Sequence, residues 1–238
     1  ATNALTAERF LRSASGAVGV RLSSSPRLPW DVLSDTLASC HPDVIILGSG
    51  CLEDDDAAPL TGSDSLVLGE AVSCDEACRW IDRGASGVVI RGREGGGKTG
   101  DLSNPVILAQ ILEQHHDANV WVRGGVGRHT ARGLIAAGAA GVVLDVQLAL
   151  MPESDSSDAV RRILRAPSLP RSVRRDGEQV LPDARGLYAA ISHHERRIGN
   201  DALIANLFAQ NYGSVREAVV DLTTRIERTA ETWRSVHR

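Results

Sequence analysis

GASGVVI at residues 84–90 returns as GAAGVVL at residues 138–144, and this repeat is the most informative feature of the sequence. A second pair of segments lies at the same spacing, with SLVL at residues 65–68 and NVWV at residues 119–122. Both pairs are 54 residues apart, so the sequence contains two copies of one unit in register. Each copy reads as a strand, a helix and a second strand, which is a βαβ unit.

The apolar segments of the chain predict six short strands. Each is a continuous apolar run, which is typical of parallel strands that are buried on both faces. The predicted strands are 17–22, 44–49, 65–70, 87–92, 120–125 and 141–146. Helical segments at 29–40, 75–83 and 129–137 alternate with them, and a glycine suited to the C′ position follows the last two.

Alternating strands and helices leave two α/β folds, a doubly wound open sheet and a (βα)₈ barrel. The pairwise repeat favours the barrel, because quarter-barrel units stack around a ring. We therefore expect residues 1–151 to form a TIM-type (βα) barrel portion that holds strands three to eight and lacks the first two.

The pattern changes after residue 151. Residues 152–199 are rich in proline and charge, and we expect them to be a connector that wraps the barrel. Residues 200–238 predict a C-terminal helical hairpin with helices at 201–211 and 214–236. Ser214 as N-cap and Glu217 three residues later form a capping box for the second helix.

Composition narrows the function classes. The 238 residues are 42% hydrophobic and 3% aromatic, with a net charge of −4. This balance gives no electrostatic footprint for nucleic acid or an anionic membrane. No apolar run approaches the ~20 residues of a membrane span, and residue types give no complete metal site. We expect a cytoplasmic location.

The first glycine-rich loop, GREGGGKT at residues 92–99, satisfies the Walker A pattern. Residues 142–145, ending in Asp145, could serve as a Walker B strand, so a P-loop NTPase is a minor alternative. Its lysine and threonine would have to start a helix directly, yet Gly100 follows at once. We expect the helix to begin near Ser103 instead, with Pro105 in its first turn.

The second loop, Gly124-Gly125-Val126-Gly127, follows the strand that would be the seventh of a full barrel. Barrel enzymes bind phosphate at the loops after strands seven and eight, where backbone N–H groups face a helix N-terminus. A phosphate site is therefore the functional interpretation. The alternative is a tight glycine turn with no ligand.

These loops carry a resemblance to a known family. Residues 88–100, 120–127 and 136–145, with the tail from 198 to 215, resemble the nitronate monooxygenase (2-nitropropane dioxygenase) family of FMN-dependent barrels. The sequence looks closest to the version embedded in multimodular polyketide synthases, which is related to the enoyl reductase of polyunsaturated fatty acid synthases. The resemblance implies an FMN cofactor.

The resemblance also implies which residues form the site. The expected cofactor-binding residues lie in the two loops and after the last strand. They are Glu94, Gly96, Gly97, Gly124, Gly125, Gly127, Asp145 and Gln147.

Two positions depart from the family pattern. Lys98 stands where the family has a catalytic histidine, and it could act as a base only if its pKa were lowered; otherwise it is a cation. Asp145 is unfavourable beside a phosphate unless it is paired, for example with Arg123 or Arg128.

Two functions follow from this resemblance. The first is an FMN-dependent oxidoreductase domain of nitronate monooxygenase or enoyl reductase type, associated with polyketide or lipid synthesis and acting on a small-molecule or carrier-bound acyl substrate. The alternative is a degenerate, non-catalytic barrel that serves as a structural or docking domain of a megasynthase. In either case an upstream segment or neighbouring synthase domains are the expected partners that complete the barrel.

Overall fold

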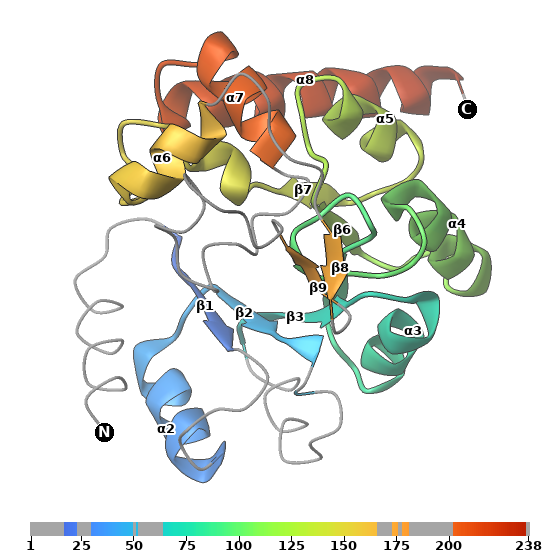
Figure 1. The fold of residues 1–238 in the computed structure, drawn as a ribbon. Coiled ribbons are helices and arrows are strands. Elements are labelled where there is room, and N and C mark those ends of the chain that lie inside the picture. Colours follow the sequence, from blue (N-terminus) through green and yellow to red (C-terminus); the bar gives the residue numbers. More distant parts are fainter. Residues whose placement is uncertain are drawn as a thin grey trace.

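The computed structural model describes residues 17–22, 30–49, 51, 64–165, 173–175, 178–180 and 202–236. Their main feature is a curled, fully parallel six-stranded sheet (Figure 1). Its strands, in spatial order, are β1 (Gly19–Leu22), β2 (Val44–Leu47), β3 (Leu66–Ala71), β4 (Gly87–Ile90), β6 (Val120–Arg123) and β7 (Gly141–Val143). All six strands predicted from the apolar runs are confirmed; β3 has the predicted length, shifted by one residue, and the other five are shorter than predicted. The spatial order follows the chain order, as in a barrel and unlike a doubly wound sheet.

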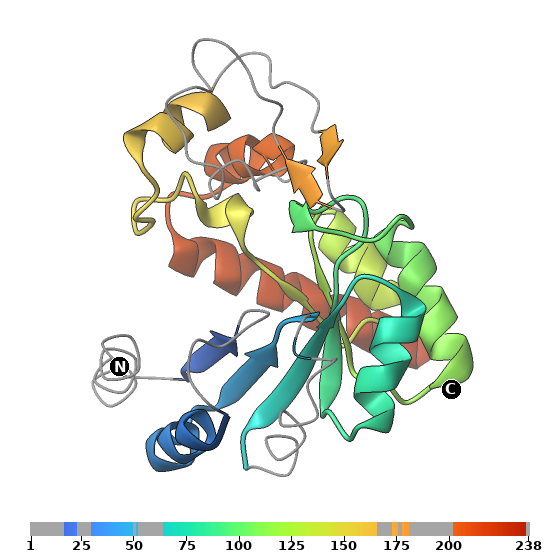
Figure 2. The same cartoon turned by 60° about the horizontal axis from the view of Figure 1, so that its bottom comes forward.

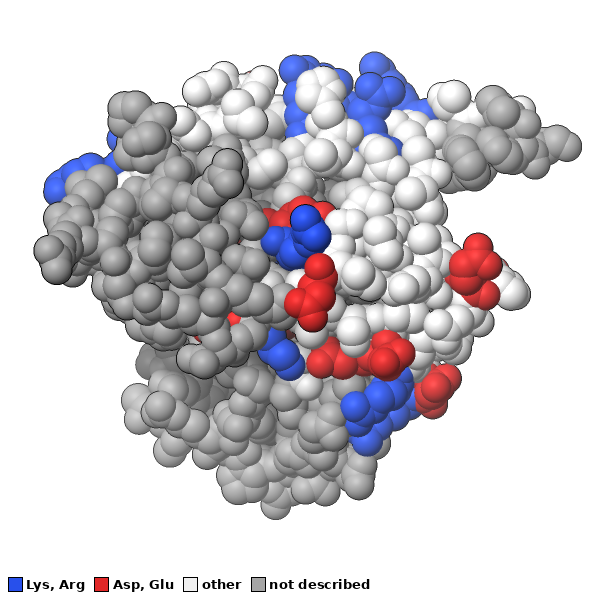
Figure 3. Space-filling model, turned by 45° about the vertical axis from the view of Figure 1, so that its right-hand side comes forward, with Lys and Arg blue, Asp and Glu red and all other residues white. Residues whose placement is uncertain are grey.

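Helices cover the outer face of this curled sheet (Figures 1 and 2), and on the face shown in Figure 3 the described acidic and basic side chains lie in small separate groups. The helices are α2 (Trp30–Cys40), α3 (Cys74–Asp82), α4 (Asn104–Gln114) and α5 (Thr130–Ala136). The glycines after α3 and α5 have positive φ angles, 85° at Gly84 and 103° at Gly138. This is the left-handed conformation expected at the C′ position, so the sequence signal for both helix ends is confirmed.

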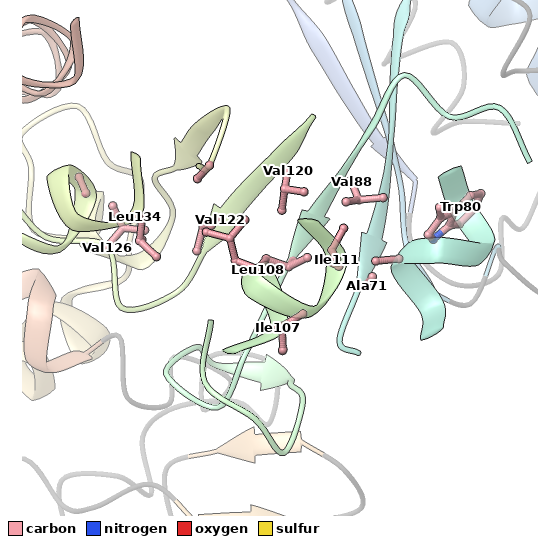
Figure 4. Close-up of a cluster of buried hydrophobic side chains, with 14 of the residues drawn as sticks. Ala71, Trp80, Val88, Ile107, Leu108, Ile111, Val120, Val122, Val126 and Leu134 are labelled. Atoms are coloured by element: carbon pink, nitrogen blue, oxygen red, sulfur yellow. The ribbon is translucent and has the colours of Figure 1, made fainter. Parts of the chain in front are cut away.

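The main core lies between the sheet and these helices (Figure 4). Trp80 of α3 lies so close to Gly69 of β3 that a Cβ atom at position 69 would be 2.2 Å from the indole Cγ. Because successive side chains of a strand point to opposite faces, Glu70 then faces the concave side of the sheet. The concave side is where the chemically reactive residues gather.

Several elements follow β7. The 3₁₀ helix η3 (Val146–Leu148) leads to α6 (Asp158–Leu164), and the strands β8 (Val173–Arg175) and β9 (Glu178–Val180) form a hairpin. This hairpin pairs with β5 (Gly97–Lys98) in the first glycine loop. The predicted connector 152–199 thus contains a helix and two strands, which its prolines and charges concealed. The domain boundaries themselves stay a prediction.

Two helices end the described chain, α7 (Ala202–Asn211) and α8 (Val215–Val236). The Ser214 hydroxyl accepts a hydrogen bond from the Glu217 amide at 3.1 Å, as the capping-box pattern indicated. Helix α8 packs against α5 and α7 against η3 (Figure 2). Of the helices in the described residues, none combines the length and apolarity that a membrane crossing requires.

Candidate functional site

Five charged side chains gather at the carboxyl edge of the sheet. Glu70 lies near the end of β3, and Arg123 ends β6. Arg91 and Asp145 follow β4 and β7, and Arg21 belongs to β1. The carboxyl ends of parallel strands meet at one edge, where α/β proteins place their ligand sites. These five residues are called the Glu70 cluster below.

The Glu70 carboxylate holds the cluster together. Its Oε1 accepts hydrogen bonds from Arg21 Nε at 2.7 Å, Arg123 Nη1 at 2.8 Å and Arg91 Nη2 at 3.2 Å, while its Oε2 accepts from Arg21 Nη2 at 2.6 Å. The side chain is only 11% exposed. Burial alone would raise its pKa, but the three arginines together lower the pKa of Glu70 below its usual value. The carboxylate is therefore ionised and fully engaged.

The arginines also reach beyond Glu70. Arg123 donates through Nε to the Asp145 carboxylate at 2.9 Å and pairs with it through Nη2 as well. The interpretation that Asp145 is paired with Arg123 is confirmed, whereas Arg128 instead contacts Asp221, with 3.4 Å between Nε and Oδ2. The cluster thus contains three guanidinium groups and two carboxylates, a net charge of +1.

Arg91 has the least exposed side chain of the three arginines in the cluster. Its Nη1 donates to the Gly96 carbonyl at 3.2 Å and to the Lys98 carbonyl at 3.4 Å. Burial, and after it the positive charge of Arg123, lower the pKa of Arg91 to about 10. The lowered pKa thus reflects mainly the burial of the Arg91 guanidinium and, after it, the nearby charge of Arg123.

A cavity of about 1000 Å³ opens directly over the cluster. One wall is the first glycine loop at residues 96–98, and another is formed by η3 and the segment 154–157. The volume reaches the upper end of the range of ~300–1,000 Å³ that is usual for ligand and cofactor sites. This cavity is the candidate functional site.

Four of the predicted site residues line this cavity: Gly96, Gly97, Lys98 and Asp145. The Lys98 ammonium lies 3.0 Å from Ser49 Oγ and 3.6 Å from Glu76 Oε1, and its side chain is 50% exposed. It is therefore solvated and ion-paired rather than enclosed in an apolar site. This arrangement favours the role of a cation over that of a base.

The glycine turn at 124–127 lies behind the cavity wall and serves to join two loops. Gly124 and Gly125 have φ angles of 91° and 66°. A Cβ atom on Gly124 would be 2.7 Å from the Gly95 Cα, so side chains are excluded by both conformation and space. The Gly127 N–H donates to Thr130 Oγ1 at 2.7 Å. The tight-turn interpretation thus explains these glycines, and their phosphate role stays a prediction.

Gln147 and Glu94 likewise act as internal braces. The Gln147 amide donates to the Val126 carbonyl at 3.2 Å and accepts from the Asp145 N–H at 2.8 Å, and its side chain is fully buried. Glu94 Oε2 accepts from the Asn104 N–H at 3.0 Å and so occupies the N-terminus of α4. Neither residue lies among those that line the cavity.

The first glycine loop does not have the shape of a P-loop. Gly97 and Lys98 form a strand, β5, and α4 begins at Asn104 with Pro105 in its first turn. A P-loop lysine would stand at the start of a helix. The Walker A match is therefore coincidental, as the positions of Gly100 and Pro105 indicated.

Sequence reasoning missed Arg21, Glu70 and Arg91 as site residues. A signal was available: each of the three stands at or next to the carboxyl end of an apolar strand, on the concave face by alternation. The strands are predicted from continuous apolar runs, and this pattern gives no role to a charged residue at the end of a strand.

A curled parallel sheet with outer helices and a polar cavity at its carboxyl edge is the architecture of part of a TIM-type (βα) barrel. The sequence profile of nitronate monooxygenase matches residues 11–224, and the chain belongs to this family.

Solved structures agree with this fold. FabK from Thermotoga maritima superposes with a TM-score of 0.74 at 18% identity, over 98% of this chain and 83% of that one. Nitroalkane oxidase from Streptomyces ansochromogenes gives a TM-score of 0.63 at 16% identity, over 100% of this chain and 87% of that one.

Curated relatives match a shorter stretch. The (3aS,4S,5R,7aS)-5-hydroxy-7a-methyl-1-oxo-octahydro-1H-indene-4-carboxyl-CoA dehydrogenase of Mycobacterium tuberculosis is 33% identical over 98 residues, or 40% of this chain. The protein of the same name from Rhodococcus jostii is 33% identical over 97 residues. The matched stretches span 27% and 26% of these two relatives.

Proposed function

We propose that the chain is an FMN-dependent oxidoreductase domain in which flavin and substrate share the cavity over the Glu70 cluster. The observation that carries the proposal is a cavity of about 1000 Å³ at the carboxyl edge of a barrel-type sheet, in a chain of the nitronate monooxygenase family. Barrel enzymes place their active sites at this edge.

The residues present fit a flavin in size. The cavity is large enough for a flavin and a small substrate, and the glycine loop at residues 96–98 is part of its lining. Gly96, Gly97 and Lys98 would hold the cofactor from one side and the cluster from below. The flavin would supply hydride or electron transfer, which no side chain of this site provides.

Lys98 and the cluster would orient the substrate and hold negative charge on it. The Lys98 ammonium is fixed by Ser49 and Glu76, and it stands at the rim of the cavity. A fixed cation near a developing negative charge stabilises it without reorganisation during the reaction. Lys98 would therefore act on an enolate or a related anion by electrostatic stabilisation.

An acyl thioester is the substrate class that we favour, and lipid or polyketide synthesis is the setting. The names of the two curated relatives describe carboxyl-CoA dehydrogenases, which are thioester enzymes. The polyketide synthase setting rests on the resemblance of residues 88–145 and 198–215 to the version embedded in such synthases.

A further segment would complete the barrel. Within the described residues, β1 pairs only with β2 and β7 only with β6, so both outer strands have an open side. Unpaired backbone groups of an edge strand are a template for another strand. An upstream segment or a neighbouring synthase domain would supply the first two strands of the eight and close the cavity.

A non-catalytic barrel is the second candidate, and one observation favours it. The Gly127 N–H, expected to face a phosphate, is already bonded to Thr130 Oγ1. In this alternative the glycine turn is inherited architecture, and the domain has a structural or docking role.

Flavin uptake separates the two candidates. The oxidoreductase predicts that the purified chain shows the visible absorption bands of flavin, or acquires them and quenches FMN fluorescence when FMN is added. Riboflavin is the matched control, since it lacks the phosphate and should bind more weakly. A colourless protein that takes up no FMN would favour the non-catalytic barrel.

A further inference from the structure

We infer that the floor of the cavity binds an oxyanion group of the substrate, a carboxylate or a phosphate, through Arg21 and Arg91 of the Glu70 cluster. The inference rests on the proposed function, because it assigns this cavity to the substrate. It adds one chemical feature to the acyl thioester proposed above, a carboxylate or phosphate group next to the apolar part of the substrate.

Guanidinium groups outnumber carboxylates within the Glu70 cluster. Three guanidinium groups share the two carboxylates of Glu70 and Asp145. Lys98, Asp155 and Glu178 also line the cavity, and with them the lining carries no net charge, so the excess positive charge is local to the cluster. Two of these guanidinium groups are largely buried, with side chains 13% exposed at Arg91 and 17% at Arg123. A buried charge is stable only when it is paired, so a bound anion would complete the cluster.

Arg21 and Arg91 also have guanidinium donors that Glu70 does not engage. Glu70 engages Nε and Nη2 of Arg21 and Nη2 of Arg91, and backbone carbonyls engage Nη1 of Arg91. No hydrogen bond to any described residue is seen for Arg21 Nη1 or Arg91 Nε. Guanidinium donors suit carboxylate and phosphate oxygens, and both arginines line the cavity.

Glu70 acts as a positioning residue for the three arginines. Its two oxygens accept four hydrogen bonds from three arginines that come from β1, β4 and β6. The arginines would otherwise repel one another and turn toward solvent. Glu70 therefore holds them at the floor without using up all their donors.

The remaining lining sets the shape of the ligand. The cavity is also lined by the apolar side chains of Val72, Val146 and Leu148, by the hydroxyl groups of Ser154 and Ser156 and by the carboxylates of Asp155 and Glu178. The apolar side chains would contact an apolar part of the ligand next to its anionic group. A neutral hydrocarbon would leave the arginine donors unsatisfied and is disfavoured.

Titration of the flavin-free chain with small anions tests this inference. The probes are butyrate, inorganic phosphate and the neutral amide butyramide, added at constant ionic strength and followed by calorimetry and thermal unfolding. We expect saturable binding of butyrate, phosphate or both, and none of butyramide. Tighter binding of butyrate would indicate that the anionic group of the substrate is a carboxylate, and tighter binding of phosphate would indicate a phosphate.

Variants locate the binding. Arg21→Gln should lower the affinity of the chain for the anion about tenfold or more, because one charge-assisted hydrogen bond is lost. Arg21 is 44% exposed, so this variant should fold even if Arg91→Gln does not. Arg132→Gln on α5, outside the cavity lining, is the matched control and should leave the affinity unchanged.

Two results would overturn the inference: no saturable binding of either anion, or equal affinity in wild type and Arg21→Gln. Flavin uptake is measured separately and keeps the two proposals apart. FMN uptake without anion binding would reject the inference alone, whereas anion binding without FMN uptake would support the site and reject the flavin.

Discussion

Replacing Glu70 by glutamine tests whether this carboxylate stabilises the charged cluster. The change of one carboxylate oxygen to an amide group removes the negative charge that pairs with three arginines. The glutamine has nearly the same volume, so packing against the sheet is preserved. What changes is the electrostatic environment of Arg21, Arg91 and Arg123, which would then face only Asp145.

The structure sets the size of the effect. Breaking a buried ion pair by removing one partner costs about 3–5 kcal/mol. Two of the arginines reduce this cost in stability. Arg21 is 44% exposed and can be solvated, and Arg123 keeps its ion pair with Asp145. Arg21 and Arg91 both lose their ion pair with Glu70, and of these two only Arg91 is largely buried, at 13% exposed. We therefore expect Glu70→Gln to lower the free energy of unfolding by about 3 kcal/mol, at the low end of that range.

Thermal unfolding at neutral pH measures this change. A loss of about 3 kcal/mol corresponds to a fall in Tm of roughly 6–12 °C for a chain of this size. Glu113→Gln on the exposed face of α4 is the control and should change stability by less than about 0.5 kcal/mol. Equal stability of Glu70→Gln and wild type would refute the view that Glu70 organises the cluster.

The same pair of proteins has a signature in pH. The pKa of Glu70 is lowered from 4.5 in the folded chain, so its stabilisation is complete above that value and is lost as the pH falls through the folded pKa. The stability difference between wild type and Glu70→Gln should therefore be constant near neutrality and shrink below about pH 4.5. Urea denaturation at several pH values measures it, and a difference that does not shrink in acid would contradict the assignment.

Two further sets of variants test the packing and the charge of the site. Gly69→Ala should destabilise the chain by about 2 kcal/mol or more, because its Cβ would lie 2.2 Å from the Trp80 ring. Gly133→Ala in α5 has free space and should gain up to about 1 kcal/mol, and urea denaturation compares the two; a tolerated Gly69→Ala would contradict the close packing. Asp145→Asn removes the partner of Arg123 and raises the cluster charge from +1 to +2, so anion and FMN affinity should increase in titrations; an unchanged affinity would place the ligand elsewhere.

The sequence predicts the strand and helix order well, because the repeat at residues 84–90 and 138–144 fixes a βαβ unit. All six strands lie where the apolar runs placed them, and Gly84 and Gly138 end helices in the left-handed conformation. Local signals of this kind depend on neighbours in the chain. They carry over to the structure without knowledge of the tertiary fold.

The site was harder to predict because it depends on distant residues. Glu70 meets Arg21 and Arg123 across 49 and 53 positions of sequence, and no local pattern reports such a contact. Gly124 looked like a phosphate ligand, yet a contact with Gly95 explains it. A glycine pattern shows that the backbone needs freedom, and it does not show which neighbour requires that freedom.

Titration with FMN tests the central claim that the cavity over the Glu70 cluster is a flavin site. We predict that the wild-type chain quenches FMN fluorescence with one-to-one stoichiometry. Ala149→Trp, which fills the cavity, should abolish the quenching, and Ala140→Trp at an exposed position should not. Failure of the wild type to bind FMN, or equal binding by folded Ala149→Trp, would contradict the account.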